Sequence, residues 1–117
     1  MLPTIKEATS KGVFLPAKFV DSAIEIQLRQ LRRYRIQPRT VVAKLVGGAW
    51  MFRRANLHSM FHIGQRNTDK ATEVLKEYHI PIIGTDIGDN FGRSIEFDLS
   101  TGKITVYKAG GVFWTEL

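Results

Sequence analysis

Residues 95–107 read Ile-Glu-Phe-Asp-Leu-Ser-Thr-Gly-Lys-Ile-Thr-Val-Tyr. Apolar side chains alternate with acidic ones from Ile95 to Leu99, and a second extended run follows at 104–107. Strict alternation is typical of a strand that buries one face. The intervening Ser100–Lys103 contains a glycine and suits a turn. The stretch therefore predicts a β-hairpin in the last third of the chain.

Two amphipathic helices are expected upstream of this hairpin. The first covers about 18–34, where apolar residues recur every three or four positions and so share one face. Its stripe consists of Val20, Ile24, Leu28 and Leu31. A second helix is expected to begin near Asn67 or Thr68, either of which can cap it. Its stripe consists of Ala71, Val74, Leu75 and Tyr78.

One further strand is expected between these helices and another after the second helix. Thr40–Val46 is rich in β-branched residues and ends at a pair of glycines, and Ile80–Thr85 is a short apolar run. A polar loop, Asp86–Arg93, follows the second run. The order helix, strand, helix, strand, hairpin predicts an α/β domain with a mixed sheet and helices packed on it. No repeat or linker divides residues 1–117, so we expect one domain.

Composition excludes several classes of protein. The chain has 117 residues, of which 44% are hydrophobic and 24% charged, values typical of a small globular domain and not of a disordered chain or a coiled coil. Cysteine is absent, so these residues hold no disulfide, thiolate zinc site or cysteine nucleophile. Neither a bilayer-spanning segment nor a signal peptide is apparent, so we expect a cytoplasmic location without membrane insertion.

Positive charge is concentrated in the middle of the chain. Residues 26–68 contain nine Lys or Arg and no acid, and the whole chain carries a net charge of +6. With Tyr34, Trp50 and Phe52 nearby, these bases are compatible with phosphate contacts and base stacking. The alternative is a solvated helix end whose arginines complement the helix dipole. The absence of a recognised nucleic-acid-binding motif favours the second interpretation. The arginines concerned are Arg29, Arg32, Arg33, Arg35, Arg39, Arg53 and Arg54.

The histidines do not form a convincing metal site. His58 and His62 are four residues apart, a spacing that suits one metal ion if the segment is helical, but a third ligand and the glutamate of HExxH are missing. Ordinary loop or packing histidines are the better interpretation, and His79 is expected to cap the second helix. We therefore predict neither a metal nor a cofactor.

Two glycine-containing segments have a functional and a structural interpretation. Gly47-Gly48-Ala49 follows a strand, where its backbone N–H groups can face an anion or oxyanion. The alternative is a close approach of two backbones, which only glycine permits. In the polar loop, Arg93 is placed either to clamp a carboxylate or amide of a substrate, or to pair with Asp86.

Several short motifs occur in one order along the chain. They are Lys44-x-x-Gly47-Gly48-Ala49-x-Met51-Phe52, Ile63-Gly64-x-Arg66-Asn67, Asp86-x-Gly88-x-x-x-Gly92-Arg93, Thr101-Gly102 and Lys108. This ordered set resembles CheD, the chemoreceptor glutamine deamidase family of bacterial and archaeal chemotaxis. The resemblance implies a three-layer α/β sandwich and hydrolysis of glutamine side chains on methyl-accepting receptors. It also implies a CheC-type phosphatase as a partner.

The resemblance further implies a cysteine nucleophile and a histidine base, because a thiolate attacks the amide and a thioester intermediate follows. The family carries them in Gly-Ser-Cys and His-x-Met-Leu-Pro segments, and Met1 aligns with the methionine of the second. Both residues would lie upstream of residue 1, together with the leading strands of the sheet. We thus expect residues 1–117 to be an N-terminally truncated CheD-like domain without catalytic residues of its own. Candidates for a substrate or oxyanion loop are Gly47, Gly48, Ala49, Asn67 and Arg93.

Two other departures concern the loops. Asp89 stands where the family usually has a second glycine, and Trp50 stands where a small polar residue is expected. Three hypotheses follow. The chain is a receptor glutamine deamidase whose catalytic segment lies outside these residues, a catalytically inactive module that binds a CheC-type phosphatase or a receptor, or, least favoured, a basic nucleic-acid-binding domain.

Overall fold

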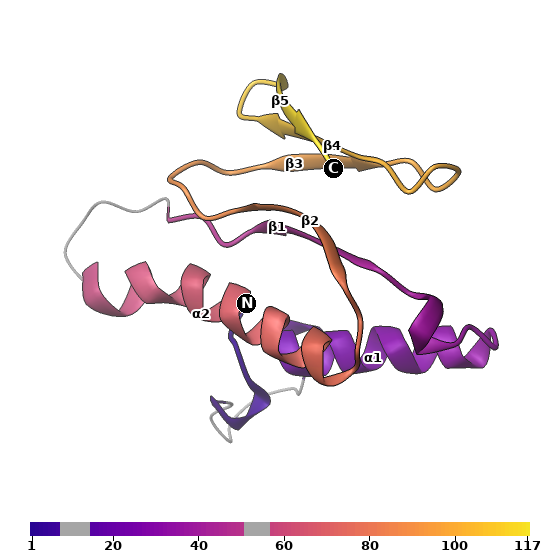
Figure 1. The fold of residues 1–117 in the computed structure, drawn as a ribbon. Coiled ribbons are helices and arrows are strands. Elements are labelled where there is room, and N and C mark those ends of the chain that lie inside the picture. The colour runs from indigo at the N-terminus through magenta and orange to yellow at the C-terminus, as the bar shows by residue number, and fades with distance from the viewer. Residues whose placement is uncertain (8–14, 51–56) are drawn as a thin grey trace.

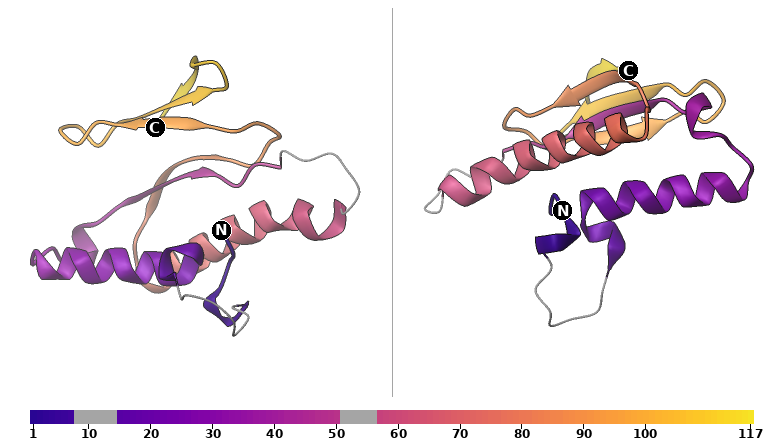
Figure 2. Two further views of the ribbon diagram at one scale, coloured as in Figure 1. Left: turned by 180° about the vertical axis from the view of Figure 1, so that it is seen from behind. Right: turned by 60° about the horizontal axis from the view of Figure 1, so that its bottom comes forward.

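The computed structural model describes residues 1–7, 15–50 and 57–117. The helices are α1 (Val20–Arg33) and α2 (Leu57–Glu77), and the strands are β1 (Ala43–Gly47), β2 (Ile82–Ile87), β3 (Ser94–Phe97), β4 (Ile104–Lys108) and β5 (Val112–Glu116). Short 3₁₀ turns occur at Ile5–Glu7, Pro16–Lys18 and Pro38–Thr40. Figure 1 and Figure 2 show the helices on one side, β1 and β2 in the middle, and β3–β5 on the far side. This arrangement confirms the expected α/β class.

Parallel and antiparallel pairing are both present, in two sheets. β1 pairs with β2 in parallel, and β4 lies between β3 and β5 with antiparallel pairing on both sides. Lys44 of β1 links the two sheets, because its Nζ donates to the main-chain oxygens of Gly102 (2.6 Å) and Leu117 (2.7 Å). The ammonium group thereby adds a charged donor to the Leu117 oxygen, which also accepts from the Ile104 N–H (2.9 Å), and to the Gly102 oxygen in the turn between β3 and β4.

α1 confirms the predicted first helix and its apolar face. Val20 and Leu28 are buried, and Ile24 and Leu31 pack against the core. The centre of that core consists of Leu28, Leu75 and Ile80, so it joins both helices to the β1–β2 layer. The helix cannot run into Pro38, where a short 3₁₀ turn leads to β1.

α2 begins at Leu57, so the prediction of a helix start at Asn67 or Thr68 was wrong. Both residues lie within the helix, and Thr68 uses its hydroxyl to bond the Gly64 carbonyl one turn earlier (3.0 Å). The misleading signal was the capping ability of Asn67 and Thr68, and Gly64, although glycine lowers helix propensity, lies within the helix. Its role in the fold is a contact with Gly48, described below.

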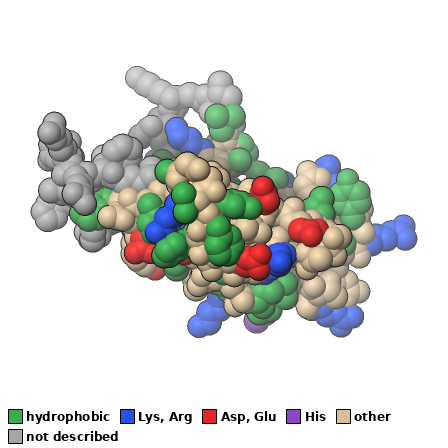
Figure 3. Space-filling model, turned by 90° about the horizontal axis from the view of Figure 1, so that it is seen from above, with side chains coloured by type: hydrophobic (Ala, Val, Ile, Leu, Met, Phe, Trp, Pro, Cys, Tyr) green, Lys and Arg blue, Asp and Glu red, His purple; other side chains and the backbone are tan. Residues whose placement is uncertain are grey.

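The C-terminal hairpin was predicted correctly, but β5 was not predicted. Phe97 of β3 pairs with Ile104 of β4. All four residues of β3 are exposed, however, so the burial of one strand face that the alternation indicated was wrong in this structure. β5 returns through Gly110 and Gly111, which both have positive φ (80° and 74°), the requirement of a tight hairpin turn. Viewed down onto this layer, Figure 3 shows hydrophobic side chains among acidic and basic ones.

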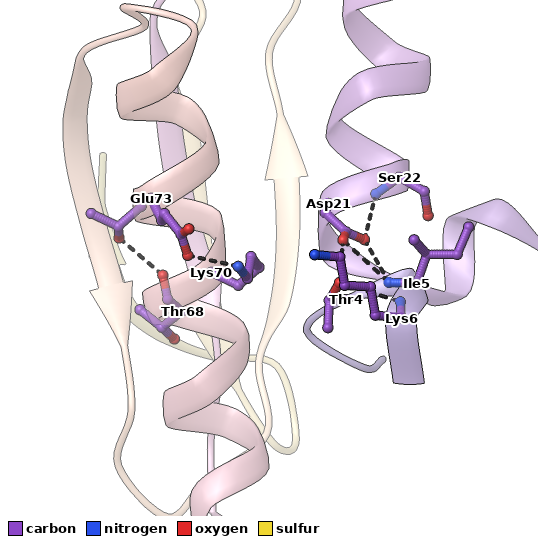
Figure 4. A network of polar contacts seen from close by, with 9 residues as sticks. Thr4, Ile5, Lys6, Asp21, Ser22, Thr68, Lys70 and Glu73 are labelled. Atoms are coloured by element: carbon purple, nitrogen blue, oxygen red, sulfur yellow. Dashed lines mark hydrogen bonds and ion pairs between the residues drawn. The ribbon is translucent and has the colours of Figure 1, made fainter. Parts of the chain in front are cut away.

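The N-terminal residues are tied to the start of α1. Leu2 forms a parallel bridge with Phe19, and Asp21 accepts hydrogen bonds from the Thr4 hydroxyl (2.6 Å) and from the main-chain N–H groups of Ile5 (3.0 Å) and Ser22 (2.8 Å). Figure 4 shows these contacts around one carboxylate. Burial alone would raise the pKa of Asp21, but the hydrogen bonds prevail and lower it.

Candidate active site at the carboxyl ends of the parallel strands

The loops after β1 and β2 meet at one edge of the parallel sheet. Gly47 and Ile87 are register partners at the strand ends, and the Gly88 N–H donates to the Gly47 carbonyl (2.9 Å). One step further, the Trp50 N–H donates to the Asp89 carbonyl (2.7 Å). The carboxyl edge of parallel strands is where open α/β sheets usually bind ligands. The two predicted loops therefore form one structural unit at that edge.

Gly48 and Gly64 confirm the close-approach interpretation of the glycine segment. Gly48 has φ of 65°, and a Cβ atom there would lie 2.6 Å from the Thr68 hydroxyl. A Cβ atom on Gly64 would overlap the carbonyl oxygen of Gly48. The loop after β1 consequently rests directly on the backbone of α2. The proposed oxyanion role of Gly47, Gly48 and Ala49 stays a prediction.

Asn67 lies on α2 and faces the N-terminal residues. Its Nδ2 donates to the main-chain oxygen of Met1 (2.8 Å). Its Oδ1 is buried and has no hydrogen-bond partner within residues 1–7, 15–50 and 57–117. The side chain thus joins α2 to the start of the chain, and a role toward substrate stays a prediction.

Arg93 forms the ion pair with Asp86 that was one of its two predicted roles. Its Nε lies 2.7 Å from Asp86 Oδ2, and the Arg93 and Asp86 side chains are 3% and 13% exposed. The guanidinium also donates to the carbonyls of Gly88 (2.9 Å) and Phe91 (3.3 Å). This hydrogen bonding holds the pKa of Asp86 below its usual range, with Arg93 as the main cause. Arg93 therefore organises the loop after β2 from inside.

Asp89 adopts a left-handed backbone conformation with φ of 57°. A glycine enters this region without cost, whereas most other residues are strained there and Asp is among the better tolerated. The Asp89 carboxylate lies 3.8 Å from an Arg93 nitrogen. Asp89 thus adopts a turn conformation and places a charge beside the guanidinium.

An aromatic and cationic cluster beside this loop was not predicted. The Trp114 indole N–H donates to Asp86 Oδ1 (3.1 Å), and its ring meets Phe91 edge-to-face, with centroids 5.3 Å apart. Lys108 Nζ lies 4.1 Å from the Phe91 centroid and 3.5 Å from the Trp114 ring. Lys108 belonged to the motif set, but the contact with Trp114 depends on the position of β5, which no sequence pattern indicated.

Other candidate residues lie away from this edge or outside the described part. Met51, Phe52, Arg53 and Arg54 are outside the described residues, and so are the side chains of His58 and His62, although both positions belong to α2. His79 ends α2 with φ of 57°, as predicted, and its N–H donates to the Lys76 carbonyl (3.0 Å). In the part of the chain that is described, no group of three His, Asp or Glu residues has the geometry of a metal site.

The basic cluster lies near the opposite edge. Arg32 and Arg33 end α1, and the chain then passes Arg35 and Arg39 before it enters β1 at its amino end. Arg29 pairs with Glu25 one turn earlier (3.1 Å), so part of this charge serves the helix itself. The arginines from Arg29 to Arg39 are therefore separate from the candidate site, whereas Arg53 and Arg54 lie outside the described residues.

An apolar cavity of about 790 Å³ also lies away from the candidate site, between α1, β1 and the β3–β4 hairpin. Leu28, Val42, Ile83 and Phe97 are among its lining residues, and Lys44 is the only charged one among the described lining residues. Its chemistry does not suit amide hydrolysis. We place the candidate site at the carboxyl edge on the geometry of the loops.

Most of the chain matches one known protein family. Residues 1–108 match the family model described as CheD chemotactic sensory transduction. The chain belongs to the CheD family. All the candidate residues lie within the matched part, whereas β5 (Val112–Glu116) lies outside it.

Curated CheD proteins resemble the chain over most of its length. Proteins named as probable chemoreceptor glutamine deamidase CheD are 42% identical over 106 residues in Methanosarcina barkeri, 39% over 93 in Caldanaerobacter subterraneus subsp. tengcongensis, and 36% over 99 in Desulforamulus reducens. These matches cover 91%, 80% and 85% of the chain, but 66%, 57% and 60% of the three relatives. The chain thus spans less than two thirds of their length. No helix in its described part is long and apolar enough to cross a membrane.

Proposed function

We propose that residues 1–117 are the larger part of a CheD domain that deamidates glutamine side chains of methyl-accepting chemoreceptors in the cytoplasm. The match of residues 1–108 to the family carries the proposal, and the printed names of the relatives support the substrate. The loops at the carboxyl edge of β1 and β2 supply the binding side of the site. A CheC-type phosphatase is the proposed protein partner.

The reaction needs a nucleophile that these residues lack. A thiolate adds to the amide carbonyl, ammonia leaves after protonation by a histidine, and water opens the resulting thioester to give glutamate. The chain has no cysteine. In the proposed enzyme, the thiol and the histidine base come from polypeptide outside these residues. Backbone N–H groups of Gly47, Gly48 and Ala49 are the proposed oxyanion donors.

The missing cysteine also favours a second function. Without a thiol, the chain retains a folded surface and acts as a binding module for a CheC-type phosphatase or a receptor. This candidate predicts saturable binding of such a partner by the 117-residue chain, measured by calorimetry, without release of ammonia from receptor fragments.

The gene upstream of Met1 distinguishes the two functions. If the deamidase proposal holds, in-frame codons there encode a Gly-Ser-Cys segment and a histidine, and the protein expressed with them converts receptor glutamines to glutamates, detected by mass spectrometry. Replacement of that cysteine by alanine abolishes conversion. An upstream sequence without cysteine contradicts the deamidase and leaves the binding module.

A further inference from the structure

The C-terminal strand contacts the candidate site although it lies outside the part of the chain that matches the family. β5 follows residue 108, where the match ends, and places Trp114 beside the loop after β2. The Trp114 indole N–H donates to Asp86 Oδ1 (3.1 Å), and its ring packs edge-to-face on Phe91 at an interplanar angle of 72°. One side chain thus reaches both the base of the loop, at Asp86, and its middle, at Phe91.

Trp114 shares the Asp86 carboxylate with Arg93. Oδ2 accepts from Arg93 Nε (2.7 Å), and Oδ1 accepts from the Trp114 indole (3.1 Å) and, at longer distance, from a terminal nitrogen of Arg93 (3.5 Å). With both oxygens held, the carboxylate has one orientation, which fixes the plane of the Arg93 guanidinium. That guanidinium donates to the Gly88 and Phe91 carbonyls. Hydrogen bonds through Asp86 and Arg93 therefore link the Trp114 side chain of β5 to the backbone of the loop.

Cations add to the contact between the aromatic rings. Lys108 Nζ lies over Phe91 and Trp114, at 4.1 and 3.5 Å from their centroids, and Arg93 Cζ lies 4.3 Å from the Phe91 centroid. Cations over ring faces are attracted by the ring quadrupole. Phe91 is consequently held by Arg93, Lys108 and the indole together.

We propose that Trp114 is a positioning residue that fastens the loop Gly88–Arg93 to β5 and so sets the position of Asp89. The Asp89 carbonyl receives the Trp50 N–H, which connects the loop to the segment after β1. The attachment of the loop to β5 by Trp114 depends only on the fold. An effect of this attachment on amide hydrolysis rests on the proposed function.

Amide hydrogen exchange of the 117-residue chain, followed by NMR, tests the fastening. Trp114→Phe keeps a ring against Phe91 and Lys108 but removes the indole N–H, and we expect exchange at residues 88–92 to accelerate at least about tenfold, as for loss of one hydrogen bond to a charged group. Trp114→Ala removes the ring as well, so the acceleration is larger. Exchange at Leu28 in α1 stays unchanged in Trp114→Phe, which separates a local effect from global destabilisation.

Phe113→Ala is the matched control. Phe113 precedes Trp114 in β5, pairs with Tyr107 of β4 and is 59% exposed. The Phe113→Ala variant should leave amide hydrogen exchange at residues 88–92 unchanged. In Asp86→Asn, the Trp114 indole ¹H–¹⁵N resonance should shift, because its acceptor loses the charge. Equal loop acceleration by Phe113→Ala and Trp114→Phe, or an unmoved indole resonance, would overturn the proposal without bearing on deamidation.

Discussion

Gly48 and Gly64 make the contact on which the loop after β1 depends. Each presents backbone where any other residue presents a Cβ atom, and the two backbones touch. The motifs containing these glycines were recognised from the sequence, but their mutual contact was not, because Gly64 was expected to precede the helix. A glycine has a low helix propensity, but it can still lie within a helix when tertiary packing requires a residue without a Cβ atom at that position.

Gly64→Ala tests this contact. In an ordinary helix interior, replacement of glycine by alanine stabilises by about 1 kcal/mol. Here the methyl group overlaps Gly48, so we expect a loss of about 1–3 kcal/mol in the free energy of unfolding, measured with urea. Gln65→Ala, an exposed neighbour on α2, should change it by less than about 0.5 kcal/mol. Stabilisation by Gly64→Ala would contradict the contact.

The Asp86 carboxylate makes the free energy of unfolding depend on pH, and the direction of this dependence follows from its pKa. Its pKa is lowered from 3.8, chiefly by the Arg93 hydrogen bond. A carboxyl with a depressed pKa in the folded state stabilises fully above its unfolded pKa, and this stability is lost as pH falls through the folded value. Asp86→Asn should therefore cost about 1–3 kcal/mol at neutral pH.

The difference between wild type and Asp86→Asn should shrink as pH falls below about 4, in urea unfolding measured across that range. Asp98→Asn is the control. The pKa of Asp98 is also lowered, mainly by the Ser100 hydroxyl, but the side chain lies in an exposed turn, so the effect of this substitution should change less with pH than that of Asp86→Asn. A pH-independent difference for Asp86→Asn would show that the ion pair contributes nothing through its charge.

At the scale of elements, sequence periodicity predicted correctly those helices and strands whose contacts are local in the chain. The α1 stripe and the β3–β4 hairpin are explained by residues close in sequence. The Asp86–Arg93 pair was also accessible, because both residues belong to one loop. β5 and the contacts of Trp114 could not be predicted from the sequence. They depend on a turn at Gly110 and Gly111 and on contacts with residues far earlier in the chain.

Lys44 connects elements that sequence patterns cannot place together. Lys44→Met preserves the length of the side chain but leaves the main-chain oxygens of Gly102 and Leu117 without the ammonium donor. We expect a loss of about 1.5–3 kcal/mol in urea unfolding, the range for hydrogen bonds to a charged group. Lys103→Met removes the exposed pair with Glu116 (3.2 Å) and should cost less than about 1 kcal/mol. Equal losses would refute the link between the sheets.

For the molecule as a whole, the layered arrangement brings two loops to one edge and leaves the arginines of α1 near the other. Family membership accounts for the motifs within residues 1–108, and the fastening by β5 lies beyond them. The proposed amide hydrolysis requires a reactive thiol, and no residue of this chain supplies one.

The most direct measurement uses the native protein purified from its host, weighed intact and assayed on a receptor fragment with and without alkylation by iodoacetamide. We expect a polypeptide heavier than these 117 residues that converts receptor glutamines to glutamates, and complete loss of conversion after alkylation. Conversion by the cysteine-free 117-residue chain itself, or by the native protein after full alkylation, would contradict it.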